Sequence, residues 1–146
     1  MQIFEFHFNP KSKEDRFFDT FAYEPENMYE KRLGNLYAVA ELKNALPSNS
    51  KLPENLAKAA KERYYTFSFK TQERAASEAL KKANEFLTEE VKKENVSWLE
   101  NLNFALLSIK NFDLIFTKTG DIKILLLRAG RIIDIGKNLD LQEIDP

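Results

Sequence analysis

The last third of the chain carries short apolar runs that are separated by polar or turn-forming residues. The runs are Phe104–Ile109, Phe112–Phe116, Ile122–Leu127 and Arg131–Ile135, and the tripeptide Thr119-Gly120-Asp121 separates the second run from the third. Each run is rich in β-branched or aromatic residues and is bounded by turn residues, which is typical of consecutive β-strands. A meander this apolar needs helices or a second sheet over at least one face.

Three more strands are predicted in the N-terminal part of the chain. The first residues alternate between aromatic and polar side chains, in the order Phe4, Glu5, Phe6, His7 and Phe8. This alternation predicts a half-buried strand with a phenylalanine face. Phe17–Tyr23 and Leu36–Leu42 predict two further strands. Because Leu36–Leu42 is nearly continuous in apolar character, we expect it in the centre of a sheet.

Two helices are predicted between these strands and the C-terminal runs. Pro53 fits the first position of one helix, in which Leu56, Ala59 and Ala60 share a side. The second helix is expected from about Thr71 to Lys93. Its apolar positions keep helical spacing over several turns: Ala75, Ala76, Ala79, Leu80, Ala83, Phe86, Leu87 and Val91. The small alanines in this stripe favour close packing against a flat partner, which we expect to be a sheet.

The predicted elements follow one another as three strands, two helices and four strands. Strands and helices are segregated along the chain, which favours an α+β fold over a parallel sheet built from βαβ units. We expect a layered sandwich of antiparallel sheets with the helix pair on one outer face. Residues 1–146 are interpreted as a single domain, and the short acidic ending Leu139–Pro146 suggests either the N-terminal portion of a longer protein or a domain that a partner completes.

The composition excludes several classes of site and partner. Hydrophobic residues make up 43% and charged residues 31% of the 146 residues, which is typical of a globular protein. The formal net charge of −1 gives no general attraction to nucleic acid or to an anionic membrane, so neither is expected as a partner. Without cysteine, and with His7 as the one histidine, the chain offers no thiolate site and no multi-histidine zinc site. Since neither a signal peptide nor an apolar span of ~20 residues is recognisable, we expect a cytoplasmic location.

Four acidic residues lie next to predicted strands: Glu14, Asp15, Glu41 and Asp121. Such carboxylates, brought together from distant parts of the chain, are the ligands that Mg²⁺ or Mn²⁺ prefers. Acidic residues are also common in turns and at strand ends, where they cap the backbone or stay solvated. Their positions alone leave both interpretations open.

A mixture of aromatic and basic residues surrounds the end of the first predicted helix: Lys61, Arg63, Tyr64, Tyr65, Phe67, Phe69 and Lys70. Such a mixture can bind single-stranded nucleic acid, but the near-neutral charge favours aromatic side chains that pack into the core. His7 is expected to be an exposed strand residue, and Ser48-Asn49-Ser50 a turn and helix-capping segment, because a nucleophile there has no evident base.

The order of these motifs resembles the N-terminal part of the metal-dependent serine/threonine protein phosphatases of type 2C. In that family an acidic pair precedes a strand, as Glu14-Asp15 does here. A long alanine-rich helix leads to a strand with small residues at its start, as Ala75–Val91 leads to Asn103-Phe104-Ala105. A Gly-Asp pair then joins two strands, as Gly120-Asp121 does, and a later run ends in Arg-x-Gly, as Leu127–Gly130 does. The resemblance covers most of residues 14–140 and implies a sandwich fold with a two-metal centre.

Several departures from the family pattern affect that centre. The Asp-Gly pair that ends the family's central strand is replaced by Glu41-Leu42, a longer acid followed by a bulky residue. The glycine-rich loop is replaced by Lys43–Ser50, which has no glycine, and Pro10 occupies the place of the phosphate-binding arginine. The family's later metal-binding aspartates fall in a C-terminal segment beyond this sequence. The resemblance therefore implies a fold relative with a degraded centre, for which no cofactor is expected, or Mg or Mn if the site is functional.

Three hypotheses about function follow. The first is a non-catalytic, phosphatase-like module that binds or regulates another protein. The second is a metal-dependent serine/threonine phosphatase in which Glu14, Asp15, Glu41 and Asp121 hold metal and a C-terminal segment supplies the remaining ligands. The third is a structural or assembly protein that pairs with another chain, or with itself, through unpaired sheet edges.

Overall fold

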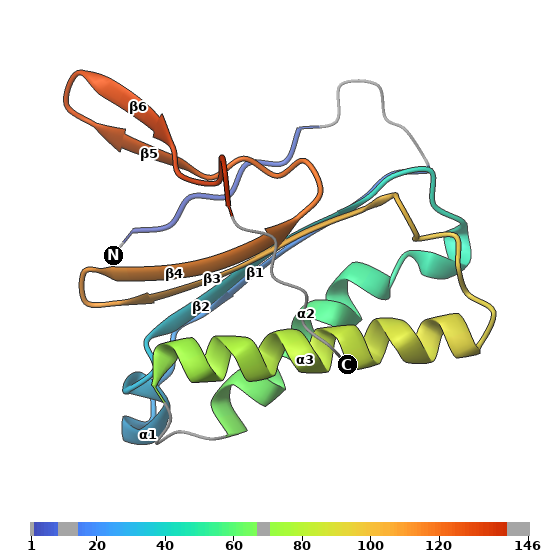
Figure 1. The fold of residues 1–146 in the computed structure, drawn as a ribbon, viewed down its shortest axis with the longest axis horizontal. Coiled ribbons are helices and arrows are strands. Elements are labelled where there is room, and N and C mark those ends of the chain that lie inside the picture. The colour runs from blue at the N-terminus through green and yellow to red at the C-terminus, as the bar shows by residue number, and fades with distance from the viewer. Residues whose placement is uncertain (1, 9–14, 67–70, 140–146) are drawn as a thin grey trace.

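The computed structural model describes residues 2–8, 15–66 and 71–139. In chain order the elements are β1 (Phe17–Tyr23), α1 (Met28–Lys31), β2 (Asn35–Leu42), the 3-10 turn η1 (Pro47–Asn49), α2 (Leu52–Thr66), α3 (Gln72–Lys92), β3 (Leu102–Lys110), β4 (Asp113–Thr119), β5 (Leu125–Arg128) and β6 (Arg131–Asp134). Figure 1 shows α2 and α3 lying across one face of a sheet. None of the described helices has the length and apolar character that crossing a membrane requires.

The strands β1 to β4 form one antiparallel sheet in the order β1-β2-β3-β4. The bounds of β1 are those predicted from the sequence, and β2 lies inside the sheet, which confirms its predicted central position. The apolar runs Phe104–Ile109 and Phe112–Phe116 correspond to β3 and β4. The chain therefore has the mixed α and β composition with an antiparallel sheet that the α+β prediction requires.

The core lies between the sheet and the two helices. Alternate residues of β2 and β3 supply the sheet side of this core: Leu36, Ala38, Ala40, Leu42, Phe104 and Leu106. On α3 the buried residues include Ala75, Ala79 and Ala83, which confirms the predicted alanine stripe. Because alanine carries only a methyl group, the helix backbone can approach the layer beneath it closely. Thr71 caps α3 by accepting a hydrogen bond from the backbone N–H of Arg74.

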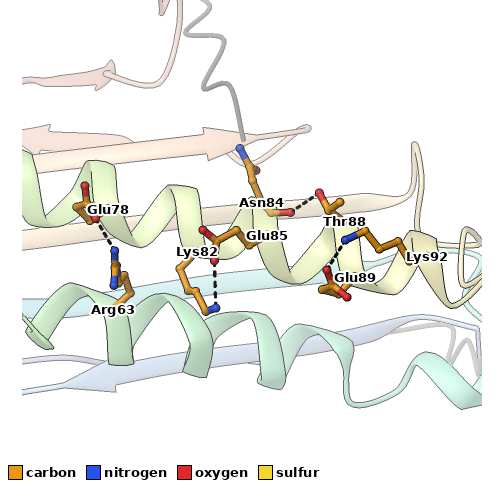
Figure 2. A network of polar contacts seen from close by, with 8 residues as sticks. All are labelled: Arg63, Glu78, Lys82, Asn84, Glu85, Thr88, Glu89 and Lys92. Carbon is orange, nitrogen blue, oxygen red and sulfur yellow. Dashed lines mark hydrogen bonds and ion pairs between the residues drawn. The ribbon is translucent and has the colours of Figure 1, made fainter.

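The polar sides of α2 and α3 are joined by an ion pair (Figure 2). The Arg63 guanidinium on α2 lies 2.9 Å from the Glu78 carboxylate on α3. Two further pairs link residues three positions apart along α3, Lys82 with Glu85 and Lys92 with Glu89. Ion pairs on such exposed surfaces contribute only about 0–1 kcal/mol each. The position of the helices on the sheet therefore depends mainly on their buried sides.

Two buried tyrosines fix α2 to the sheet. The Tyr64 hydroxyl donates to the carbonyl oxygen of Leu33 at 2.8 Å and also contacts the Ser108 hydroxyl. The Ser108 hydroxyl also donates to the Leu33 carbonyl, at 3.4 Å. The Gln72 side-chain amide donates to the Ser108 hydroxyl at 2.8 Å and to the Ser108 carbonyl at 3.0 Å. The start of α3 is therefore bonded to β3 by the same network.

The neighbouring Tyr65 completes this contact. Its hydroxyl donates to the carbonyl oxygen of Gly34 at 2.8 Å, immediately before β2 begins. The rings of Tyr64 and Tyr65 meet edge to face, with centroids 4.9 Å apart. Burial raises the pKa of both hydroxyls above the ordinary tyrosine value. Both tyrosines belong to the core, as the sequence favoured, whereas Phe67 and Phe69 lie outside the described residues.

The C-terminal runs do not extend the four-stranded sheet. Within the predicted strand Ile122–Leu127 only the last residues are extended, and β5 starts at Leu125. It pairs with β6 to form a separate two-stranded hairpin, which corresponds to the predicted run Arg131–Ile135. Figure 1 shows this hairpin on the side of the sheet away from α2 and α3. The described strands thus comprise a four-stranded sheet and a two-stranded one, and a complete second layer of the sandwich stays a prediction.

The predicted N-terminal strand with a buried phenylalanine face is wrong. Residues 2–8 pair with no strand among the described residues. Phe4, Phe6 and Phe8 are 74%, 89% and 83% exposed. Glu5 and His7 turn towards the sheet instead, since both contact the Thr20 hydroxyl, at 3.0 and 3.3 Å. Alternation identifies two faces of a segment, but it does not identify which face meets the protein.

Replacing Tyr64 by phenylalanine should destabilise the fold. The variant Tyr64→Phe removes the shorter of the two bonds to the buried Leu33 carbonyl, which keeps only the Ser108 hydroxyl at 3.4 Å, and this loss costs about 1–3 kcal/mol. Tyr29→Phe is the matched control because Tyr29 is 66% exposed, and it should change the stability by less than about 0.5 kcal/mol. Urea unfolding followed by circular dichroism measures both values. Equal midpoints for the two variants would contradict the structural role of the Tyr64 hydroxyl.

Alkaline pH should also reduce the stability. Burial raises the folded-state pKa values of Tyr64 and Tyr65 above the unfolded value of about 10, so folding favours the protonated hydroxyls. This contribution is complete below pH ~10 and is lost as the pH rises towards the raised folded values, because the unfolded chain loses its protons first. Urea unfolding at about pH 8 and about pH 11 tests this. The loss should be smaller in Tyr64→Phe than in the wild type, and an equal loss in both would contradict the assignment.

Candidate functional site

One end of the four-stranded sheet gathers the polar residues that the sequence singled out. Glu41 lies near the end of β2, on the face that points away from the helices, directly opposite Asn103 on β3. Its carboxylate accepts a hydrogen bond from the Asn103 side-chain amide at 2.7 Å. The Arg16 guanidinium and the Lys43 ammonium lie 3.5 and 3.6 Å from the same carboxylate. Two cations and one amide therefore already surround the negative charge of Glu41.

Asn103 connects Glu41 to the turn that contains Asp121. The Asn103 side-chain oxygen accepts a hydrogen bond from the backbone N–H of Asp121 at 2.9 Å. Gly120 makes this approach possible, because a Cβ at Gly120 would lie 1.9 Å from that oxygen, and its φ of +74° also favours glycine. The Asp121 side chain is exposed. Asn103 is 7% exposed. In the sequence, the one sign of its bridging role is that a polar residue stands at the start of an apolar run.

The remaining predicted acids lie at the start of β1. Asp15 is exposed, and its backbone carbonyl accepts a hydrogen bond from the N–H of Ala45 at 2.8 Å. It directly precedes Arg16, so it belongs to the same end of the sheet as Glu41 and Asp121. Glu14 lies outside the described residues. In the described ranges, no three acidic or histidine side chains form a group that could hold a metal ion.

This geometry favours a neutralised structural cluster over an open ligand set. A divalent cation at Glu41 would have to displace Arg16 and Lys43, or share the carboxylate with two like charges. The amide nitrogen of Asn103 donates to Glu41 while its oxygen accepts from Asp121, so both of its polar atoms are engaged. The cluster as it stands ties β1, β2, β3 and the turn after β4 together.

Next to this cluster, the face of the sheet opposite the helices is largely apolar and only partly covered, since Glu5 and His7 contact its Thr20 and Ala105 is buried. Beyond the cluster, its residues follow from the strand register: Phe18, Thr20, Ala22, Asn35, Tyr37, Val39, Ala105, Leu107, Ile109, Leu114, Phe116 and Lys118. We call this set the open face. Phe18, Val39 and Leu114 are 43%, 39% and 38% exposed. Large exposed apolar patches are rare on monomers and are a feature of interaction surfaces.

A cavity of about 450 Å³ lies beside β1, at the beginning of α2. Two lysines line it, Lys51 and Lys58, but both pair with Glu54, at 3.0 and 2.6 Å. These two ammonium groups lower the pKa of Glu54 to about 2. The lysines are therefore already compensated, and the cavity presents no unpaired cluster of positive charge to an anionic ligand.

Other candidates from the sequence have structural roles. Asn49 is buried and donates a hydrogen bond from its side chain to the Ser97 hydroxyl, so it fixes η1 to the segment before β3. His7 is exposed and contacts Thr20.

Comparison with known proteins identified no relative of this chain. No protein-family model matches the chain, and no curated protein or solved structure matches it.

Proposed function

We propose that the protein is a non-catalytic binding module with a phosphatase 2C-like fold, and that it binds another protein chain through the open face. The observation that carries this proposal is the exposure of Phe18, Val39 and Leu114 on the open face, on the side of the sheet away from the core that the helices cover. Burying apolar surface contributes about 25 cal/mol per Å², so a partner that covers this face gains substantial free energy.

The state of Glu41 supports the non-catalytic part of the proposal. A two-metal phosphatase needs carboxylates that are free to bridge its metals and to lower the pKa of a bound water. Here Glu41 is compensated by Arg16 and Lys43 and hydrogen-bonded by Asn103. Leu42 follows it and is fully buried under the helices, where the family's glycine would offer a backbone carbonyl to metal.

The arrangement of the remaining segments supports the phosphatase 2C-like sandwich. Residues 2–8 and the β5–β6 hairpin lie on the open side of the sheet, where a second sheet of the sandwich would be (Figure 1). Both segments carry exposed apolar side chains. On this proposal they are parts of a second layer that becomes complete when a partner binds.

A metal-dependent phosphatase is the second candidate. The observation that favours it is the bridge through Asn103, which brings Glu41 and the Asp121 turn to the same end of the sheet as Asp15. On this reading a further segment would supply additional ligands and draw Arg16 away from Glu41.

A photo-crosslinker on the open face should capture a protein. With benzoyl-phenylalanine at position 39, irradiation of cells that express the chain should give a crosslinked species of higher mass. Position 91 is the matched control, because Val91 is 41% exposed and Val39 is 39% exposed, but Val91 lies on α3. Crosslinks from position 39 and none from position 91 are expected. Equal yields from both positions, or none from position 39, would refute binding through the open face.

Metal titration separates the two candidates. Isothermal calorimetry with MnCl₂ should give no saturable binding, and the protein should not hydrolyse an aryl phosphate in the presence of the metal. Asn103→Ala is the informative variant, because it removes the amide that occupies Glu41 and holds the Asp121 turn. Stoichiometric Mn²⁺ binding by the wild type that Glu41→Gln abolishes would favour the phosphatase and overturn the non-catalytic proposal.

A further inference from the structure

β1 is an edge strand of the four-stranded sheet, and one side of its backbone has no partner among the described residues. The sheet order is β1-β2-β3-β4, so β1 pairs with β2 alone. Within the described ranges, no backbone hydrogen bond from outside the sheet reaches a residue of this strand. The N–H and C=O groups along its outer edge are therefore a template on which a further strand can form.

The strand register identifies the residues whose backbone groups point outwards. Directly after β2, the Lys43 N–H donates to the Asn101 carbonyl at 3.1 Å. In an antiparallel sheet, successive residues turn their N–H and C=O groups alternately to one neighbouring strand and to the other. The odd-numbered residues of β2 therefore point to β3, and the even-numbered ones point to β1. By the register of β1 with β2, the backbone groups of Phe18, Thr20 and Ala22 point away from the sheet.

The contacts that already reach Thr20 do not use these backbone groups. Glu5 and His7 contact the Thr20 side-chain hydroxyl, which belongs to the open face. Neither contact involves the N–H or the carbonyl of Thr20. The outward donors and acceptors of β1 are thus distinct from the groups that the N-terminal segment contacts.

β1 carries few of the features that protect an edge strand from pairing. Such strands are commonly short, or they contain a proline, a lysine or a bulge. The strand Phe17–Tyr23 has neither proline nor lysine, and its register with β2 runs through all 7 residues without a bulge. Asp19 is its one charged residue. The opposite edge strand, β4, carries both Asp113 and Lys118. β1 is therefore the less protected of the two edges.

The cavity of about 450 Å³ lies along this outer edge. Four consecutive residues of β1 line it, from Phe18 to Phe21. Because consecutive strand residues point to opposite faces of a sheet, a cavity that all four line lies beside the strand and not over one face. Lys51, Glu54 and Lys58, at the start of α2, form the opposite wall. A groove along an edge strand can accept an extended segment, which pairs with the strand through main-chain hydrogen bonds.

The charges that line this groove are balanced. Lys51 and Lys58 both pair with Glu54, and Asp19 adds a second carboxylate. Two ammonium groups and two carboxylates give no net attraction to a charged ligand. On the side of the open face, Phe18 is 43% exposed and offers apolar surface to a β-branched neighbour on an adjacent strand. The groove therefore suits an uncharged segment that is apolar at alternate positions.

We propose that β1 binds an extended, uncharged segment of another protein, which lies in the groove beside α2 and adds a strand to the edge of the sheet. The main chain of this segment pairs with the outward groups of Phe18, Thr20 and Ala22. Its β-branched side chains lie beside Phe18, and its polar side chains lie on the side of α2. This inference goes beyond binding through the open face, because the backbone of β1 provides the recognition.

Hydrogen exchange followed by NMR tests the state of the edge. In the protein alone, the outward amides of Phe18, Thr20 and Ala22 should exchange quickly, whereas those of Asp19 and Phe21, which point to β2, should exchange slowly. The probe is a synthetic peptide of alternating valine and threonine with the 7 residues of β1. At saturation it should slow the three outward amides by about tenfold or more. Slow exchange of these amides without peptide would overturn the proposal, because the chain itself or a second copy would then occupy the edge.

A variant of Thr20 tests whether the backbone provides the affinity. Thr20→Pro removes an outward N–H, and proline is tolerated at such positions of an edge strand. Fluorescence anisotropy with the labelled peptide should show binding weakened by about tenfold or more. Thr20→Val is the matched control, since it loses the same hydroxyl contacts with Glu5 and His7 but keeps the N–H, and it should bind like the wild type. Circular dichroism checks that both variants fold, and unchanged affinity in a folded Thr20→Pro would contradict the proposal.

Two N-methylated peptides give a test that leaves the protein unchanged. One carries methyl groups on the valine nitrogens and the other on the threonine nitrogens. An added strand turns only alternate amides to β1, so one peptide should lose binding and the other should keep it. Equal loss with both peptides, or no saturable binding of the parent peptide at millimolar concentration, would overturn the proposal. The crosslink from position 39 reports on the open face, so binding there stands or fails separately.

Discussion

A buried hydrogen-bond network around the Tyr64 hydroxyl joins the helices to one face of the sheet. Through Leu33 and Ser108 it bonds α2 to the turn before β2 and to β3, and Gln72 adds the start of α3 to the same network. These groups are buried, so an alternative placement of the helices would leave several of them without partners, at about 1–3 kcal/mol each. The sheet is apolar on both faces, and fixing the helices on one face leaves the other in contact with water.

The polar cluster at the end of the sheet and the open face have complementary properties. At the cluster, the charge of Glu41 is compensated within the chain by Arg16, Lys43 and Asn103. On the open face, Phe18, Val39 and Leu114 stay exposed although Glu5 and His7 contact Thr20. The charges of the cluster are thus balanced within the chain, whereas the exposed side chains of the open face are mainly apolar. This contrast favours association with a protein surface over the binding of a metal or an anion.

The sequence predicted the helices and strands better than it predicted which of their faces are buried and which residues contact one another. Local apolar patterns predict the bounds of β1, the interior position of β2 and the alanine stripe of α3. The apolar side chains that form these patterns are the ones that pack against the neighbouring layer. The faces of residues 2–8 were assigned the wrong way round, because periodicity does not include the hydrogen bonds of Thr20. Asn103 was missed as a bridge between Glu41 and Asp121, since that role depends on strand register and on a turn many residues away.

The tightest steric requirement at the polar end of the sheet falls on Gly120, a residue that has no side chain. Its missing methyl group leaves the space that the Asn103 oxygen occupies. Any larger residue there would push Asn103 aside and withdraw the neutral donor from Glu41, whose charge would then be balanced by mobile lysine and arginine side chains alone. An exchange at Gly120 would therefore alter the hydrogen bonding of a carboxylate that it never touches.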